Sequence, residues 1–316
     1  MNLSFRAPLC GALLLTVALA MHVAAQTQTP LTFKTSNRLQ TMVDAAAKET
    51  LEKFADKKLE TNQLAITLVD LREGRSAERA SFRGDVQIYP ASVIKLFYLA
   101  AAHRWMEDGK LKDTEELRRA MKDMIVDSLN EATGLIVDSV TDTTSGPELP
   151  PDELGKWYDK RNAVNRYFVS LGYQNINVNR KPWCEGPYGR EMQSVKRHKP
   201  NHRNWLTTEA TARLLTEIAT DHAVTPERSK QMMELLERRP FEKNAEGQSR
   251  EYTGVALPPG SKLWSKAGWT SEVRHDAAYV ELPNGVKFVL VTFTVGHASD
   301  KEIVPAVARL IVDGLK

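Results

Sequence analysis

The spacing of apolar residues separates helical from extended stretches along the chain. Residues 38–55 place apolar side chains at intervals of three and four, the pattern of a helix with one buried face. Residues 63–70 and 78–89 instead alternate or cluster strand-forming residues, and a turn-forming sequence at 72–75 lies between them. The first part of the chain therefore predicts a surface helix followed by a pair of strands.

The middle of the chain is predicted to be mainly helical. Residues 92–108 are apolar on almost every side, as in a helix at the centre of a lobe, and Gly109 supplies a stop. Residues 141–206 are the least regular part, and loops this long inside a compact domain are usually functional. Amphipathic patterns predict further helices at 113–127, from Asn130 onward, at 159–171, at 207–221 and at 225–239.

The end of the chain returns to extended patterns. Residues 262–270, 275–282 and 286–296 predict three strands, and residues 301–314 predict an amphipathic helix. No internal repeat is present, so the order of elements predicts an α+β fold, an α/β sandwich. In it, a mainly antiparallel sheet built from both chain ends is flanked by the terminal helices, and an all-helical lobe is inserted. We place the sheet lobe at about 35–88 and 257–316, and the helical lobe at about 89–256.

The N-terminus has the three parts of a signal peptide. Arg6 is the single charge in the first 25 residues, an apolar run extends from Leu9 to Met21, and small residues follow up to Ala25. The run is short for a membrane span, and cleavage after Ala25 fits the small-residue rule. The sequence predicts an exported protein, periplasmic or secreted, whose mature domain is 26–316 and which is not stably inserted in a membrane.

Charge and cysteine content exclude several classes of partner and site. The net charge is +3 from 43 basic and 40 acidic residues, which indicates neither nucleic acid nor an anionic membrane as the partner. Cys10 leaves with the signal peptide, so the mature chain keeps only Cys184 and cannot form an intrachain disulfide. We expect a monomer that acts on a small molecule or a peptide.

Ser92 and Lys95 are the first candidates for chemistry. Three residues apart at a helix start, they share one face, which brings a hydroxyl and an amine within reach of each other. Apolar neighbours would bury the lysine and lower its pKa, and the helix N-terminus offers N–H groups to an oxyanion. Read alone, the pair fits equally a serine cap followed by a lysine that extends to solvent.

Two further patterns follow in the chain. Ser128-Leu129-Asn130 lies between two predicted helices, where serine and asparagine also serve as caps. Lys266-Ala267-Gly268 begins a predicted central strand, where a small residue and a glycine let a ligand lie close to the backbone. Each pattern alone is weak, but their order and their predicted positions are those of the penicillin-recognising serine acyl transferases.

On these motifs the chain resembles the class A β-lactamase family and its β-lactamase-like serine hydrolase relatives, over about residues 35–316. The resemblance implies that Ser92 is the acylated nucleophile, Lys95 its proton acceptor and Ser128 the relay to the leaving nitrogen. It implies substrate binding by the residues that follow, with the N–H groups of Ser92 and Trp269 as the oxyanion hole and with Arg274 as a second cation for a carboxylate. The implied binding residues are Asn130, Lys266, Ala267, Gly268, Trp269 and Arg274.

The sequence departs from the family pattern at several positions. Leu129 stands where the family usually has aspartate, and Ala267 stands where it usually has a hydroxyl that faces the substrate carboxylate. The segment between Ser92 and Ser128 is short, which predicts a lower cleft wall. The family's deacylating glutamate corresponds best to Glu185, one residue late after a tryptophan; Glu191 and the absence of any such base are the alternatives.

Two histidine patterns in the sequence are compatible with other kinds of site, a metal site and a serine–histidine–aspartate triad. His198 and His202 have the spacing of metal ligands, but basic residues and a proline surround them and no acidic or cysteine partner follows, so we expect no zinc site. His275 and Asp276 are adjacent in a predicted strand and therefore face opposite sides, which argues against a triad with Ser92.

The resemblance implies hydrolysis of β-lactam amides through an acyl-serine, as in antibiotic resistance, without a metal or an organic cofactor. Two alternatives stay open because a fold does not fix a substrate. One is a D-alanyl-D-alanine-type peptidase or an amidase or esterase. The other is a penicillin- or peptidoglycan-binding module that deacylates slowly.

Overall fold

The computed structural model describes residues 31–72, 76–183, 186–197, 203–245 and 247–316. The predicted signal peptide with Cys10, the residues Cys184 and Glu185, and the pair His198 and His202 lie outside the described residues. Within the described ranges, no helix combines the length and the apolar character needed to cross a membrane.

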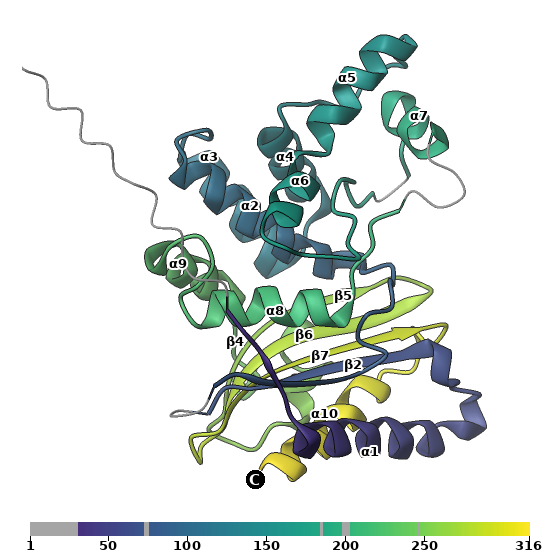
Figure 1. The fold of residues 1–316 in the computed structure, drawn as a ribbon, viewed down its shortest axis with the longest axis vertical. Helices are drawn as coiled ribbons and strands as arrows, with labels where there is room; N and C mark the ends of the chain where they lie inside the picture. The colour runs from purple at the N-terminus through teal and green to yellow at the C-terminus, as the bar shows by residue number, and fades with distance from the viewer. Residues whose placement is uncertain (1–30, 73–75, 184–185, 198–202, 246) are drawn as a thin grey trace, which may run out of the picture.

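A seven-stranded sheet divides the molecule into two layers of helices (Figure 1). Its strand order is β1-β3-β2-β7-β6-β5-β4, and every neighbouring pair is antiparallel except β1 and β3. The α+β fold with a mainly antiparallel sheet is therefore confirmed. The strands are β1 (Lys34–Thr35), β2 (Leu64–Asp70), β3 (Glu78–Phe82), β4 (Glu237–Arg238), β5 (Lys262–Trp269), β6 (Val273–Glu281) and β7 (Lys287–Val295).

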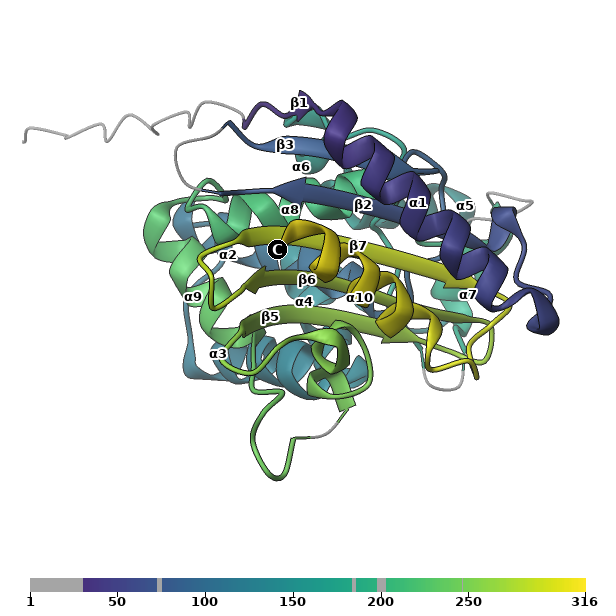
Figure 2. The ribbon, with the colours of Figure 1, turned by 90° about the horizontal axis from the view of Figure 1, so that it is seen from below.

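The two terminal helices cover one face of the sheet. Figure 2 shows α1 (Asn37–Lys53) and α10 (Ile303–Leu315) side by side across the strands. Leu39 and Val43 of α1 and Ile311 of α10 are fully buried in one apolar cluster with the inward side chains of β2 and β7. The apolar stripe predicted in residues 38–55 is thus the face that packs on the sheet.

The helical lobe covers the other face (Figure 1). The helix α8 (Thr208–Ala219) lies directly on the sheet and contacts β2, β6 and β7. Above it, α2 (Lys95–Glu107) is buried on nearly all sides, as its continuous apolar sequence predicts. The remaining helices of the lobe are α3 (Glu115–Lys122), α4 (Asn130–Thr141), α5 (Pro151–Arg161), α6 (Ala163–Ser170), α7 (Gly189–Arg197) and α9 (Pro226–Leu236).

Several element boundaries differ from the sequence prediction. The predicted helix at 113–127 ends at Lys122 and continues as a π-helical turn, Asp123–Asp127. The predicted helix at 159–171 is two helices that meet at Asn162, and the predicted strand at 78–89 stops at Phe82. The helix α7 was not predicted, because its short sequence is mostly polar and its Glu191 and Gln193 are held by contacts with distant parts of the chain.

Candidate active site

Ser92 lies in a tight turn that leads into the central helix. Residues Ala91–Ile94 form a 3-10 turn and the α-helix begins only at Lys95, so the predicted helix start at Ser92 is three residues early. Ala91 has a φ of 44°, in the left-handed region that a side chain disfavours. Such strain costs on the order of 1–3 kcal/mol and persists at sites that the surrounding structure over-determines.

The strand β5 approaches this turn as closely as a glycine allows. A β-carbon on Gly268 would lie 2.7 Å from the Pro90 carbonyl oxygen, 2.8 Å from the Ser92 nitrogen and 2.9 Å from the Val93 nitrogen. All three are backbone atoms, so they cannot move aside independently. The absence of a side chain at 268 is therefore what allows the strand and the serine turn to touch.

Lys95 joins the first two motifs. Its side chain is fully buried, and Nζ donates to the Ser128 carbonyl oxygen at 2.6 Å and to Asn130 Oδ1 at 2.9 Å. Nζ also lies 3.2 Å from Ser128 Oγ. The alternative of a lysine that extends to solvent is wrong, because the amine points into the protein.

Ser128 takes its position from the π-helical turn before it. Its φ is 58°, which reverses the chain between Asp127 and α4 and turns both its carbonyl and its hydroxyl toward Lys95. The middle residue of the motif, Leu129, has a side chain that is 45% exposed. A leucine at 129 therefore leaves the contacts of Ser128 and Asn130 intact.

Lys266 brings the third motif to the same hydroxyl. Its Nζ is buried and makes three hydrogen bonds, to Ser128 Oγ at 3.0 Å, to the Ala267 carbonyl at 2.8 Å and to Gln248 Oε1 at 3.0 Å. Burial lowers the pKa of Lys266 well below its ordinary value, and the nearby cations of Lys95 and Arg238 lower it further. The alternative of an exposed strand-end lysine is also wrong.

Gln248 is a site residue that sequence reasoning missed. Its Oε1 accepts from Lys266 Nζ and, at 2.9 Å, from the Ala267 N–H, while its Nε2 donates to the carbonyls of Ile125 and Val126. It lies in the 3-10 turn Gly247–Ser249, within the long connection from β4 to β5. No motif marks it, because its partners come from two other segments of the chain.

These residues line a cavity of about 980 Å³ between the two lobes. Its wall is mostly polar, and it includes the exposed ring of Trp269. The Ala267 N–H points away from β6 to reach Gln248, so the Trp269 N–H, two residues along the strand, points to the same open edge. The lining residues are Ser92, Val126, Asp127, Ser128, Asn130, Glu234, Glu237, Arg238, Arg239, Asn244, Gly247, Gln248, Ser249, Tyr252, Lys266, Ala267 and Trp269.

Arg274 does not occupy the place predicted for it. Within the described part of the chain it is not among the cavity-lining residues, and its buried guanidinium donates to Glu251 at 2.9 Å and stacks on the Tyr252 ring at 4.3 Å. Alternation along β6 turns Arg274 toward this pair. The expectation that it serves as a second cation for a substrate carboxylate is therefore corrected.

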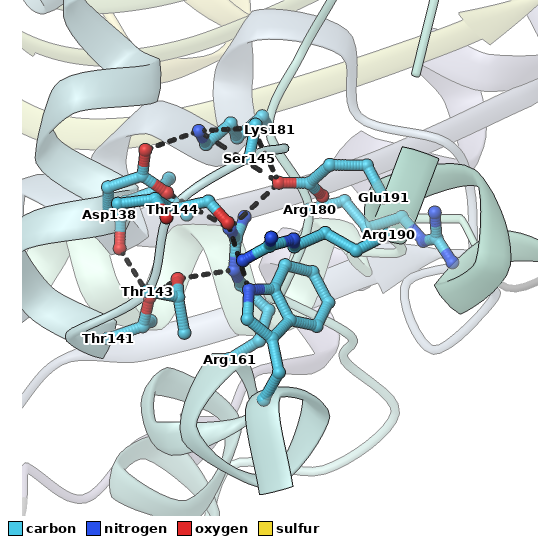
Figure 3. A network of polar contacts seen from close by, with 12 residues as sticks. Asp138, Thr141, Thr143, Thr144, Ser145, Arg161, Arg180, Lys181, Arg190 and Glu191 are labelled. Carbon is cyan, nitrogen blue, oxygen red and sulfur yellow. Dashed lines mark hydrogen bonds and ion pairs between the residues drawn. The ribbon is translucent and has the colours of Figure 1, made fainter. Parts of the chain in front are cut away.

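Glu191 belongs to a separate network inside the helical lobe (Figure 3). Its carboxylate accepts from Arg161 Nη2 at 2.8 Å and from Ser145 Oγ at 2.9 Å, and Lys181 Nζ lies 3.9 Å away. Asp138 completes the network through Arg161 and Lys181. Within the described ranges, Glu191 is buried in this network and does not line the cavity that Ser92 lines, so it is not placed to activate a water at Ser92.

His275 and Asp276 form no triad with Ser92. The His275 Nε2 lies 2.8 Å from the Tyr89 carbonyl, to which it donates, and its Nδ1 accepts from the Thr294 N–H. Burial lowers the pKa of His275 to about 4 and raises the pKa of Asp276. In the described ranges, no group of three or more histidine, cysteine or acidic residues is arranged to hold a metal ion.

The geometry agrees with comparisons to known proteins. The model of the β-lactamase enzyme family matches residues 114–315, which include the Ser128 and Lys266 motifs. The chain belongs to the β-lactamase enzyme family. The matched range begins after Lys95, and the structure brings Lys95 to Ser128 and Asn130 and the backbone of Ser92 to Gly268, all three of which lie inside the matched range. No curated protein sequence matches the chain.

Solved structures of β-lactamases and of PBP-A share the fold at low sequence identity. The β-lactamase of Sphaerobacter thermophilus is 20% identical with a TM-score of 0.61, over 86% of this chain and 96% of that one. A β-lactamase of Chitinophaga pinensis is 16% identical with a TM-score of 0.64, over 86% and 100%. PBP-A is 16% identical with a TM-score of 0.62, over 91% and 98%.

Proposed function

We propose that this member of the β-lactamase family is a serine acyl-hydrolase that opens β-lactam amides through an acyl-Ser92 intermediate. The observation that carries the proposal is the Ser128 hydroxyl, whose oxygen lies 3.2 Å from Lys95 Nζ and 3.0 Å from Lys266 Nζ. Three motifs far apart in the sequence therefore share one hydroxyl, in the wall of a cavity that Ser92 also lines.

Acylation begins with proton transfer from Ser92. Lys95, three residues later, accepts the Oγ proton while Oγ attacks the amide carbonyl carbon. The negative charge that develops on the carbonyl oxygen is stabilised by the N–H groups of Ser92 and Trp269, each worth about 3 kcal/mol in comparable acyl transfers. The close contact at Gly268 holds the two N–H groups near each other.

Ser128 returns the proton to the leaving nitrogen. A hydroxyl oxygen accepts two hydrogen bonds and donates one, so with a lysine on each acceptor side its own proton is directed to the substrate. The carbon–nitrogen bond breaks as the nitrogen takes this proton, and Lys95 replaces it. Asn130 Oδ1 keeps Lys95 in place throughout.

Release of the acyl group needs a water and a base. We propose Glu185 for this role on its place after Trp183, and Glu185 lies outside the described residues. If no base serves Ser92, the acyl-enzyme accumulates and the protein acts as a penicillin-binding module. We place the reaction in the periplasm or outside the cell, because the first 25 residues have the sequence of a signal peptide.

The proposal is tested with purified mature protein, a fluorescent penicillin and a chromogenic cephalosporin offered as free acid and as neutral carboxamide. We expect turnover that Ser92→Ala lowers by at least about 10³-fold. Ser170→Ala, at an exposed serine outside the cavity lining, is the matched control and keeps the wild-type rate.

The outcomes separate the candidate functions. Stable labelling of Ser92 without turnover indicates the slowly deacylating module. No labelling and no turnover with any probe, with Ser92→Ala indistinguishable from wild type, rejects the acyl-serine reaction. Full hydrolysis by Glu185→Gln rejects Glu185 as the base.

A further inference from the structure

The turn Gly247–Ser249 closes one end of the cavity with the side chain of Gln248. The amide oxygen accepts from Lys266 Nζ and from the Ala267 N–H, and the amide nitrogen donates to the carbonyls of Ile125 and Val126. All four contacts are between 2.9 and 3.3 Å, so both ends of the amide are satisfied by the protein.

Lys266 has no donor left for a substrate in this arrangement. An ammonium group donates three hydrogen bonds, and Nζ has three acceptors within 3.0 Å in Ser128 Oγ, Gln248 Oε1 and the Ala267 carbonyl. A substrate carboxylate can reach this lysine only by displacing one of them. Of these three acceptors, Gln248 Oε1 also accepts the hydrogen bond of the Ala267 N–H. It therefore occupies the position that an oxygen of the substrate carboxylate would need.

Ala267 offers no hydrogen-bond donor that could replace the occupied donors of Lys266. Its side chain is a methyl group buried against Tyr252 and Val304, so no hydroxyl faces the cavity, and its N–H is bound to Gln248. A carboxylate at this end of the cavity would therefore find neither a free cation nor a free neutral donor on β5.

The other cations around the cavity are also engaged. Arg238 is buried and donates to backbone carbonyls at Ile125, Ser265, Leu235 and Glu237. Arg239 pairs with two glutamates, and Arg274 pairs with Glu251. The lining holds three acidic residues, Asp127, Glu234 and Glu237, against three basic ones, so its charge does not favour an anion.

We propose that Gln248 is a specificity-determining residue that makes the enzyme prefer acyl donors with a neutral group where penicillins and cephalosporins carry a free carboxylate. This inference rests on the proposed function and names its substrate class. The preferred substrates are amides or lactams whose group next to the leaving nitrogen is an amide, an ester or a hydrogen, which Gln248 can face without being displaced.

The test compares one chromogenic cephalosporin in two forms, the free acid and the primary carboxamide. The kcat/KM for each form is divided by the rate constant of its hydrolysis by hydroxide, which corrects for the different reactivity of the two lactams. We expect wild type to have the higher normalised kcat/KM for the carboxamide. Gln248→Ala frees the Lys266 and Ala267 donors and raises the acid-to-carboxamide ratio by about tenfold or more, because a charged acceptor binds these donors more strongly than a neutral one. Gln248→Met, which keeps the volume of the side chain, raises the ratio in the same direction.

Controls separate specificity from loss of structure. Gln193→Ala removes an equivalent amide that bridges the backbone at Leu149, outside the cavity lining, and leaves the ratio unchanged. Loosening of the site would lower both rates together and would not change their ratio. Equilibrium binding of both compounds to Ser92→Ala, with and without Gln248→Ala, gives the same comparison without turnover.

A wild-type preference for the free acid, or an acid-to-carboxamide ratio that is the same in Gln248→Ala, overturns the inference while leaving the acyl-serine reaction intact. Absence of any Ser92-dependent reaction with either form, together with no binding to Ser92→Ala, overturns the proposed function and this inference with it.

Discussion

Two buried lysines in this protein have opposite surroundings. Lys181, in the network of the helical lobe, lies 2.5 Å from an Asp138 oxygen and 3.9 Å from Glu191, and Arg161 balances the second carboxylate (Figure 3). Lys266, in the cavity, is bonded only to neutral oxygens among the described residues, and burial with two neighbouring cations lowers its pKa. Lys181 has carboxylates within ion-pair distance, whereas the direct hydrogen-bond partners of Lys266 in the described ranges are neutral.

The difference separates a structural site from the proposed reactive one. In the helical lobe, ion pairs of Asp138 and Glu191 with Arg161 and Lys181 join α4, α5 and α7 to the loop after residue 180. Next to Ser128, burial lowers the pKa of Lys266 and the nearby cations of Lys95 and Arg238 lower it further, and shifted pKa values of this kind cluster at functional sites. Burial alone does not distinguish the two sites; the nature of the partners does.

The largest expected effect is on acylation, at the reactive site. Lys95→Met removes the proposed proton acceptor while keeping most of the side-chain volume, and we expect the rate of Ser92 labelling to fall by about 10²–10⁴-fold. Stopped-flow labelling with a fluorescent penicillin measures this. A labelling rate within threefold of wild type would show that Lys95 is not the base, and Lys122→Met, at the C-terminal end of α3, serves as the control.

The next effect is on stability and compares the two lysines directly. Lys181→Met removes one of the two cations that form ion pairs with Asp138 and Glu191 and leaves Arg161 to pair with both carboxylates, so we expect it to destabilise the fold by about 3 kcal/mol. Lys266→Met removes a buried cation whose hydrogen bonds are to neutral oxygens and whose nearest carboxyl influence, from Asp276, acts without a direct ion pair among the described residues, so we expect unfolding to be unchanged or shifted to higher denaturant. Urea unfolding measures the free energy of unfolding of both variants. Equal destabilisation by Lys181→Met and Lys266→Met would contradict the difference between the two sites.

The smallest effect concerns a third buried group, which makes no side-chain hydrogen bond within the described ranges. Both ring nitrogens of His103 are buried without a hydrogen bond to the described residues, and burial lowers the pKa of His103 to about 4, with Arg228 contributing. We expect His103→Leu to stabilise the fold by about 1 kcal/mol at pH 7, because an unsatisfied polar group is removed.

His103→Leu should also change how the stability of the protein depends on pH. The unfolded chain protonates His103 near pH 6.5 and the folded chain only near pH 4, so wild-type stability falls as pH decreases through this window. His275 behaves alike and keeps part of the slope. We expect His103→Leu to flatten the dependence of Tm on pH between 6.5 and 4; an unchanged slope would show that His103 titrates normally.

Much of the fold could be predicted because buried residues recur along the sequence with the repeat of a helix or of a strand. The stripe of α1, the wholly apolar α2 and the alternating strands β6 and β7 follow from sequence spacing alone. Elements held by distant partners could not be predicted. The helix α7 depends on the Arg161–Glu191 pair, and the two-residue β4 exists only because β5 lies beside it.

The site divides in the same way. Five site residues could be named because each belongs to a short sequence pattern, and the structure brings them to one cavity or to each other: Ser92, Lys95, Ser128, Asn130 and Lys266. Lys266 lies in the middle of β5 and not at its start, where the pattern had placed it. The role of Gln248 could not be named, because it comes from contacts with Lys266 and the carbonyl of Val126 across the cavity. The burial of Arg274 depends likewise on Glu251 and Tyr252, which no spacing reveals.

The contact at Gly268 limits how this protein can change over evolutionary time. Any side chain at 268 would force the strand away from the backbone of Ser92, and with it the Trp269 N–H that faces the same opening. The neighbouring positions carry no such restriction, since the Trp269 ring is 67% exposed and Gln248 lies on a loop. New substrate preferences are therefore open to the lineage through 248 and 269, while 268 stays fixed for as long as the serine is used.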